Sequence, residues 1–222
     1  RVERIVGPGN AYVAAAKKLV SSDVAIDFVA GPSEIVIIAS DGNPTWIAAD
    51  MLAQAEHDVD ARAILITTSI DLANKVQKEL EKQMDSLPTA SVARVAIERN
   101  SAIVLCDSDD DAVALSNSIA PEHLSLYDET LVAGVTNAGS IFLGPFSPEA
   151  AGDYASGPNH ILPTSGVAAI RGGLSVNDFV KVITTQRLTR DALQELGSTI
   201  STMARAEGLE AHARSVEVRL NG

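Results

Sequence analysis

Apolar segments alternate with amphipathic segments through the middle of the chain. Short runs rich in valine, isoleucine, leucine and alanine are separated by stretches whose apolar residues recur at helical spacing. The runs predict strands at Ile35–Ala39, Ala63–Thr67, Ala102–Cys106 and Ser140–Leu143. The stretches predict helices at 44–58, Asp71–Met84, Ser91–Ile97 and Asp109–Ile119. This alternation indicates an α/β fold with a mostly parallel sheet and helices on both faces, in which ligands lie beyond the carboxyl ends of the strands.

The amino-terminal segment reads as a strand, a glycine-rich turn and a helix. Ile5 and Val6 run into the turn Gly7–Asn10, which precedes a predicted helix at Ala11–Val20 and a short strand at Ala25–Val29. Such a unit can hold an anion or a cofactor at the start of its helix, or it can be a plain turn. The full G-x-G-x-x-G fingerprint of dinucleotide-binding proteins is absent.

The carboxyl-terminal third departs from the alternation. Residues Ala151–His160 are broken by glycine and proline but carry Asp, Tyr, Asn and His, which predicts a loop that could hold a site. The alternating side chains of Phe179–Thr185 predict one more β segment. Two helices follow at Thr189–Ala206 and Leu209–Leu220, with no strand after them. Because these helices cannot join the sheet, we expect an arm that embraces a partner subunit.

The helix predicted at 44–58 carries a narrow polar stripe. Asn43 can cap its start and Pro44 suits the first helical position. Asp50, Gln54 and His57 then fall on one side of the helix. The amide oxygen and the imidazole can reach one point, which could hold a metal ion if other ligands converge on it. A capped surface helix with two polar residues is the alternative, because Gln-x-x-His is a weak motif.

Composition narrows the classes of function. The 222 residues can bury one core, or one core plus an arm, and with 46% hydrophobic but only 4% aromatic residues that core is aliphatic. A net charge of −12 without a basic cluster argues against nucleic-acid binding. The single cysteine, Cys106, fits a reducing compartment, and no run approaches the roughly 20 apolar residues of a membrane span. Arg1 stands where an initiator methionine would, so we expect a fragment of a larger protein.

Four histidines are candidates for chemistry. Glu122 and His123 follow Pro121 at a predicted strand entry, where both side chains could enter one cleft. A carboxylate to activate water and an imidazole to move protons would then share a site. A chance Glu-His pair at a junction is the alternative. For His160, a structural hydrogen bond and a substrate contact are both open.

A mixed donor set for zinc can also be drawn from the sequence. It consists of Gln54, His57, Asp153 and His212, which supply two nitrogen and two oxygen donors suited to four-coordinate zinc. These residues are far apart along the chain, so spacing alone does not assemble them.

Together these motifs resemble histidinol dehydrogenase. Six stretches carry the resemblance in the order of the family: Gly7–Asn10, Ala30-Gly31-Pro32-Ser33-Glu34, Gln54-Ala55-Glu56-His57, Ala120-Pro121-Glu122-His123-Leu124, Gly152-Asp153-Tyr154 through Asn159–Thr164, and Glu207–His212. The resemblance covers the whole chain, and six ordered motifs are more specific than any single one.

The resemblance implies that this is the carboxyl-terminal half of a longer chain. Residues 1–34 would end a first Rossmann-like domain on the cofactor side. Residues 35–175 would form an incomplete Rossmann-like α/β domain with the zinc and catalytic residues, and 176–222 a carboxyl-terminal helical dimerisation arm. A cytoplasmic location is expected, or the plastid stroma if the source is a plant.

The activity implied is the zinc- and NAD-dependent oxidation of L-histidinol to L-histidine through L-histidinal, the last two steps of histidine biosynthesis. Glu122 and His123 would be the catalytic pair, and Asn10 would contact NAD. The implied zinc ligands are Gln54, His57, Asp153 and His212. The implied substrate contacts are Ser33, Gln54, His57, His123, Asp153, Glu207 and His212.

The resemblance also implies a homodimer with shared active sites, in which Glu207 and His212 complete the site of the partner. On one continuous helix these two side chains would lie about 140° apart, so a helix break is expected near Gly208. No membrane or nucleic-acid partner is expected. The alternatives are a non-catalytic fragment that binds zinc or dimerises, and a zinc hydrolase that uses Glu122 as its base.

Overall fold

The chain forms two units, which are described separately. The computed structural model describes residues 2–7, 9–29 and 31–221. Pro8 and Ala30, which belong to two of the predicted motifs, lie outside the described residues, as do the two terminal residues of the chain. The first unit is Arg1–Phe179 and the second is Val180–Gly222.

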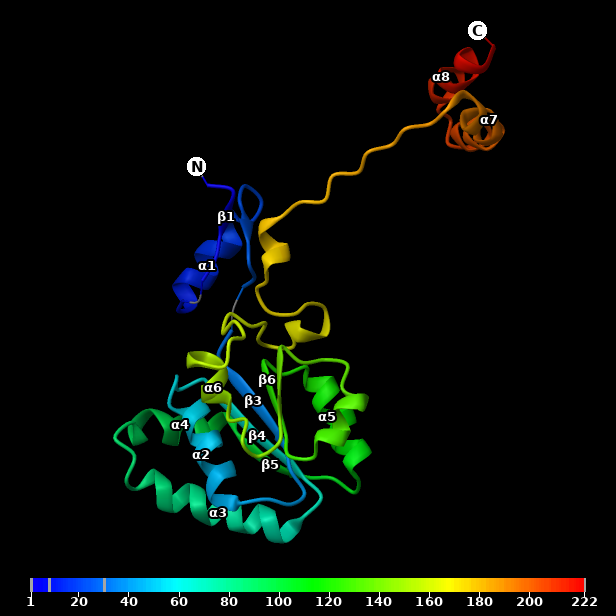
Figure 1. Cartoon of the computed structure of the whole chain (residues 1–222). Coiled ribbons are helices and arrows are strands. Elements are labelled where there is room, and N and C mark those ends of the chain that lie inside the picture. Colours follow the sequence, from blue (N-terminus) through cyan, green and yellow to red (C-terminus); the bar gives the residue numbers. More distant parts are fainter. Residues whose placement is uncertain (1, 8, 30, 222) are drawn as a thin grey trace. The chain divides into compact units, whose positions relative to one another are not determined.

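The first unit is built on a five-stranded sheet in which all neighbouring strands are parallel (Figure 1). The strand order is β5-β4-β3-β6-β7. The bounds are β3 Glu34–Ile38, β4 Arg62–Thr67, β5 Ala102–Leu105, β6 His123–Leu126 and β7 Ser140–Leu143. The predicted α/β fold with a parallel, Rossmann-like sheet is therefore confirmed.

Helices cover both faces of this sheet. Alternate side chains of a strand point to opposite faces, so Ile35 and Ile37 of β3 pack on one side and Val36 and Ile38 on the other. The first face is covered by α2 (Pro44–Ala55), α3 (Ile70–Met84) and α4 (Ala90–Asn100). The second is covered by α5 (Asp109–Ile119) and the 3₁₀ helix η1 (Glu129–Gly134). Every residue of β3 is buried, as expected for a central parallel strand.

The helix α2 begins as the sequence predicts but ends earlier. The Asn43 side chain accepts a hydrogen bond from the backbone N–H of Thr45, and Pro44 occupies the first turn. The last helical residue is Ala55. Gln54 therefore lies in the final turn, whereas His57 lies in the turn that follows the helix and is exposed.

The amino-terminal segment forms a small strand–helix–strand unit. It consists of β1 (Arg4–Ile5), α1 (Ala11–Val20) and β2 (Ala25–Ile26), with the two short strands paired in parallel. A buried ion pair closes it, with Lys17 Nζ 2.7 Å from Asp27 Oδ1. The backbone N–H of Gly7 donates to Asp27 Oδ2 at 2.8 Å, so Gly7 is linked to the residue that directly follows β2.

Two sequence predictions in the carboxyl-terminal third are wrong. The predicted loop Ala151–His160 begins inside a helix, α6 (Glu149–Tyr154), and only its second half is irregular. The predicted β segment Phe179–Thr185 is not a strand. Phe179 ends the 3₁₀ helix η3 (Val176–Phe179), and Val182 and Ile183 are exposed in irregular chain. A segment with alternating side chains forms a strand only where another strand pairs with it. Among the described residues, no strand lies beside this segment.

The second unit is a helical hairpin of α7 (Arg190–Ala206) and α8 (Glu210–Asn221). The expected helix break is confirmed, because Gly208 has φ +76° between the two helices, a conformation that glycine adopts without strain. Arg205 bridges the break through ion pairs to Glu210 at 2.9 Å and Glu217 at 2.8 Å. None of the helices among the described residues is long and apolar enough to cross a membrane.

Candidate metal and proton-transfer site

The residues predicted to act in catalysis gather at the amino ends of two neighbouring strands. Ser33 directly precedes β3, while His123 opens β6 with Glu122 just before it. The two strands pair in parallel with Ile35 opposite His123. The expectation that ligands lie beyond the carboxyl ends of the strands is therefore wrong for this group of residues.

The carboxyl ends of the same strands have a different character. Asp41, Asp109 and Asp128 line a hollow of about 330 Å³ there. Their carboxylates disfavour a phosphate-bearing ligand, which is the ligand that this edge of a Rossmann-like sheet usually accepts. The turns that enter β3 and β6 instead bring the chemically useful side chains to the opposite edge.

A cavity of about 400 Å³ lies at that edge, between two walls. Gly7, Lys17, Asp27 and Phe28 of the amino-terminal segment form the first wall. The second wall belongs to the sheet and the segments around it, and includes Ser33, His57, Glu122, His123, Asp153 and His160. Segments far apart in the sequence thus supply polar groups to one cavity, the arrangement expected of a ligand site.

A group of three side chains, two of which line this cavity, can hold a metal ion. His57, Glu149 and Asp153 each offer a ligand atom, and these atoms all lie within 4.8 Å of one another. His57 follows α2, whereas Glu149 and Asp153 both lie in α6, four residues apart and therefore on one face. An imidazole with two carboxylates is a donor set that suits zinc.

The helix α6 can approach because one of its residues is a glycine. A Cβ at Gly152 would lie 2.7 Å from ring atoms of Phe142 in β7, too close for any other side chain. This close packing sets α6 against the sheet edge and directs Glu149 and Asp153 toward His57.

Gln54 joins the cluster through Glu149. Its side chain is fully buried, and with its amide turned so that Nε2 donates it lies 2.7 Å from Glu149 Oε1 and 3.0 Å from Oε2. The opposite orientation would place the amide oxygen against the same carboxylate, an arrangement that a cation or a shared proton would stabilise. His57, Glu149 and Asp153 therefore form a donor set that fits a zinc ion, and Gln54 adjoins this set through Glu149.

Sequence reasoning missed Glu149. The signal that could have found it is the spacing Glu149-x-x-x-Asp153, which places two carboxylates on one helical face. The spacing indicates a shared face only in a helix, and the segment from Ala151 was predicted to be a loop. Conversely, Glu207 and His212 lie in the second unit, at the end of α7 and in the first turn of α8.

The start of β3 orders both members of the Glu122–His123 pair. The backbone N–H of Glu34 donates to Glu122 Oε2 at 3.0 Å. The backbone oxygen of Glu34 lies 3.2 Å from His123 Nδ1. A carbonyl oxygen only accepts, so Nδ1 carries the proton and Nε2 is left with a free lone pair. His123 Nδ1 also lies 3.7 Å from Glu122 Oε2 and 3.6 Å from Glu149 Oε1.

Burial sets the protonation of these groups. It raises the pKa of Glu122 to about 8, with the carboxyl groups of Glu34 and Asp153 adding to the shift. It raises the pKa of Glu149 to about 9, again with neighbouring carboxyl groups contributing. Burial lowers the pKa of His123 to about 4. At neutral pH this pocket therefore holds two protonated acids beside an unprotonated imidazole, a state that a bound cation would reverse for the acids it contacts.

Two further predicted site residues have identifiable local roles. The Ser33 side chain acts to lower the pKa of Glu122 against the larger effect of burial, which favours the ionised form of that carboxyl group. The Asn10 side-chain oxygen caps α1, where it accepts from the backbone N–H groups of Tyr12 at 3.1 Å and Val13 at 3.2 Å. This capping occupies the Asn10 oxygen and leaves its amide nitrogen for other contacts.

Comparison with known proteins agrees with the sequence resemblance. Residues 1–220 match the family model described as histidinol dehydrogenase. Histidinol dehydrogenase from Bacillus cereus is 53% identical over an alignment of 223 residues, which covers 99% of this chain and 52% of that protein. The enzyme of the same name from Nitrobacter winogradskyi is 52% identical, with the same coverage.

A solved structure gives the same result. The crystal structure of histidinol dehydrogenase from Elizabethkingia anophelis superposes with a TM-score of 0.94 at 46% identity, covering 100% of this chain and 52% of that one. The chain thus spans about half the length of the curated relatives that it matches. On the agreement of sequence, fold and family model, the chain belongs to the histidinol dehydrogenase family.

Proposed function

We propose that this chain supplies the zinc-binding and acid–base part of an enzyme that oxidises L-histidinol to L-histidine through L-histidinal, with NAD as oxidant. The observation that carries the proposal is the meeting, in one cavity, of a metal-capable cluster and the buried Glu122–His123 pair. Because the chain spans about half of its relatives, the activity is proposed for the protein assembled with an amino-terminal half, and the chain alone is expected to be inactive.

The metal ligands proposed from this chain are Gln54, His57 and Asp153, together with Glu149. His212 from the arm of a second copy would complete the set. Zinc bound there would supply a positively charged centre that orients the imidazole and amine nitrogens of the substrate. The protein's share of that task is to present donors already converged to within 4.8 Å, so little reorganisation is needed on binding.

His123 is proposed to take the proton of the substrate alcohol. Its pKa of about 4 keeps the ring unprotonated at neutral pH, and the contact of Nδ1 with Glu34 leaves Nε2 as the acceptor. The hydroxyl proton would move to Nε2, and NAD, when bound, would accept the hydride that carries the electron pair of the C–H bond. The product of this step is the aldehyde.

Glu122 is proposed to activate the water that attacks the aldehyde. The oxygen of that water would bond to the aldehyde carbon while one of its protons passes to the Glu122 carboxylate. The carbonyl oxygen would take the proton that His123 gained in the first step, giving a hydrate. The pKa of about 8 keeps Glu122 protonated at neutral pH in the metal-free pocket, so its carboxylate becomes available as a base when the pH approaches 8 or when a bound cation lowers this pKa. In the second oxidation a hydroxyl proton of the hydrate would pass to the unprotonated His123, and a second NAD, when bound, would accept the hydride, giving the carboxylic acid.

The remaining substrate contacts are proposed for Ser33, Gln54, His57, His123 and Asp153 of the first unit, and for Glu207 and His212 of the arm. Residues 1–34 would contribute the cofactor side, with Asn10 near NAD, and residues 176–222 the dimerisation arm. The first assignment is supported by the cavity wall that Gly7, Lys17, Asp27 and Phe28 form. The second is supported by exposed apolar side chains on the arm, among them Val182 and Met203.

The test is formation of reduced NAD from L-histidinol by the chain alone and by the chain co-expressed with the amino-terminal half of the Bacillus cereus relative. We expect no turnover by the chain alone and turnover by the assembled protein, lost with a chelator and restored by zinc. Turnover by the chain alone would contradict the inactive-half proposal. Zinc binding without turnover in either preparation would favour a non-catalytic zinc-binding or dimerising fragment, and cofactor-independent hydrolysis would favour a hydrolase.

A further inference from the structure

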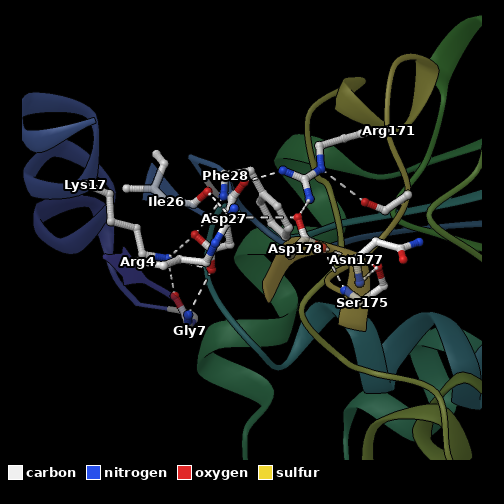
Figure 2. Close-up of polar contacts among 11 residues, drawn as sticks. Arg4, Gly7, Lys17, Ile26, Asp27, Phe28, Arg171, Ser175, Asn177 and Asp178 are labelled. Atoms are coloured by element: carbon white, nitrogen blue, oxygen red, sulfur yellow. Dashed lines mark hydrogen bonds and ion pairs between the residues drawn. The ribbon is translucent and has the colours of Figure 1, made fainter. Parts of the chain in front are cut away.

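A polar cluster joins the amino-terminal segment to the loop that follows β7 and α6 (Figure 2). Arg171 is at its centre. Its Nη1 donates to the backbone oxygen of Asp27, its Nη2 donates to Asp178 Oδ1 at 3.1 Å, and its guanidinium carbon lies 4.9 Å from the centroid of the Phe28 ring. One side chain thus contacts a carbonyl, a carboxylate and an aromatic face at the same time.

Asp178 holds the guanidinium in place from the other side. Its Oδ2 accepts from the backbone N–H of Ser175 at 2.8 Å, which fixes the carboxylate. Its Oδ1 lies 3.8 Å from Arg4 Nη1, and Arg4 in turn donates to the backbone oxygen of Ile26 at 2.9 Å. The Ser175 N–H together with the two arginines keeps the pKa of Asp178 below its usual value, so this carboxylate is charged at neutral pH.

These contacts are the polar connection between the two walls of the cavity. Within the ranges 2–7, 9–29 and 31–179, every hydrogen bond or ion pair that joins the first two ranges to the third involves Arg171 or Asp178. The segment is rigid within itself, because Lys17, Asp27 and the turn at Gly7 are hydrogen-bonded together. Arg171 therefore connects an internally hydrogen-bonded segment to the rest of the first unit.

We propose that Arg171 is a positioning residue, which holds the cavity wall of Gly7, Lys17, Asp27 and Phe28 at a fixed distance from His123. The inference rests on the proposed function, in that this wall would receive the nicotinamide cofactor. Hydride transfer needs the donor carbon and the acceptor ring to be held in contact. Loss of a fixed position for this wall would therefore lower the affinity for the cofactor and the rate of hydride transfer. Arginine suits the position because its planar group of five N–H donors serves several acceptors while stacking on a ring, and lysine lacks this geometry.

The kinetic test uses the protein assembled with an amino-terminal half. Arg171→Ala is expected to raise the KM for NAD about tenfold and to lower kcat, with a much smaller change in the KM for L-histidinol. Zinc content should stay stoichiometric, because the metal-capable cluster lies on the other wall. Arg171→Lys should recover only part of the loss. The matched control is Arg94→Ala, which removes an arginine with weak surface pairs to Asp85 at 3.8 Å and Glu98 at 3.9 Å and should leave both KM values unchanged.

A second measurement keeps the inference separate from the proposed function. Hydrogen exchange of the chain alone should become about three- to tenfold faster across residues 2–28 in Arg171→Ala, while peptides from β3 and β6 keep their protection. Unchanged exchange together with an unchanged KM for NAD would overturn the inference. Parallel increases in both KM values with loss of zinc would also overturn it, because they indicate general unfolding. If the unmodified protein does not oxidise histidinol, the proposed function fails, and the exchange experiment alone decides whether Arg171 holds the wall.

Discussion

His123 Nδ1 lies 3.2 Å from the backbone oxygen of Glu34, and the N–H of the same residue donates to Glu122 at 3.0 Å. One peptide position at the start of β3 therefore orients both members of the proposed acid–base pair. The parallel register of β3 and β6 fixes this relationship, since Ile35 pairs with His123. The orientation of Glu122 and His123 thus depends on the pairing of β3 with β6, and the contact with Glu34 determines the tautomer of His123.

Replacing the proposed base should separate the two oxidations. Glu122→Gln keeps the size of the side chain and can still accept from Glu34, but it cannot take a proton from water. We expect oxidation of L-histidinal to slow by about 10²- to 10⁴-fold and oxidation of L-histidinol to L-histidinal to slow much less. Single-turnover rates with each substrate measure this difference. Equal losses in both steps would contradict the assignment of Glu122 to water activation.

Removing the imidazole next to α2 should remove the metal. His57→Ala takes one of the three converging donors, and we expect the purified protein to lose stoichiometric zinc and all turnover. Metal analysis after dialysis measures the first effect. Glu98→Gln, which changes an exposed carboxylate of α4, is the matched control and should retain one zinc per site. A His57→Ala protein that still holds one zinc would show that this residue is not a ligand.

Glu149 provides a sharper test, because the sequence did not suggest it. Glu149→Gln keeps a hydrogen-bonding partner for Gln54 and little changes the volume of the buried side chain. If Glu149 acts on the metal, zinc affinity should fall by about 10- to 100-fold while the fold is kept. Competition with a chromophoric chelator gives the affinity. An unchanged affinity would leave Glu149 as a structural partner of Gln54 alone.

Much of this site could be anticipated from local sequence patterns. Ser140–Leu143 and Asp109–Ile119 have the predicted bounds, and the other core elements differ by one to three residues. Glu122 and His123 at the entry of β6 were also placed correctly, because Pro121 marks that entry. The convergence of His57 with Asp153 rests on tertiary packing, and local pattern does not contain that information.

The two wrong predictions of secondary structure, at Ala151–His160 and Phe179–Thr185, have a common physical reason. The helix α6 contains a glycine and spans Glu149–Tyr154, too short to be stable by its own propensity. It is stabilised where Gly152 packs on Phe142, a contact between distant parts of the chain. The segment after Phe179 fails in the opposite sense, since its alternation is real but no strand pairs with it among the described residues. Local periodicity indicates which secondary structure a segment favours. Its packing partners determine whether that structure forms.

The stability of the metal-free chain should fall as the pH rises from about 6.5 to 8. Glu122 and Glu149 have ordinary pKa values of 4.5 but folded values of about 8 and about 9. In this window the folded state holds protons that the unfolded state has lost, so stability decreases by up to about 1.4 kcal/mol per pH unit for each group. Below pH 6.5 the effect of His123 on stability has the opposite sign. Its ring takes up a proton near pH 6.5 in the unfolded state but only near pH 4 in the folded state, so its contribution to stability decreases as the pH falls.

Urea unfolding in the presence of a chelator, at several pH values, measures this dependence. Glu149→Gln should make the slope between pH 6.5 and 8 shallower, because one of the two titrating groups is gone. Saturating zinc should flatten or reverse the slope, since the ion favours the deprotonated ligands. A metal-free chain whose stability is constant from pH 6.5 to 8 would contradict the protonated state proposed for the pocket.

The central claim is that one cavity unites the metal-capable cluster with the Glu122–His123 pair for the oxidation of histidinol. Anomalous X-ray diffraction at the zinc edge, on the assembled protein with bound L-histidinol, tests it most directly. We predict a zinc peak in contact with His57 and Asp153, with the substrate alcohol within hydrogen-bond distance of His123 Nε2. A zinc peak elsewhere, or a substrate alcohol remote from His123, would contradict the account.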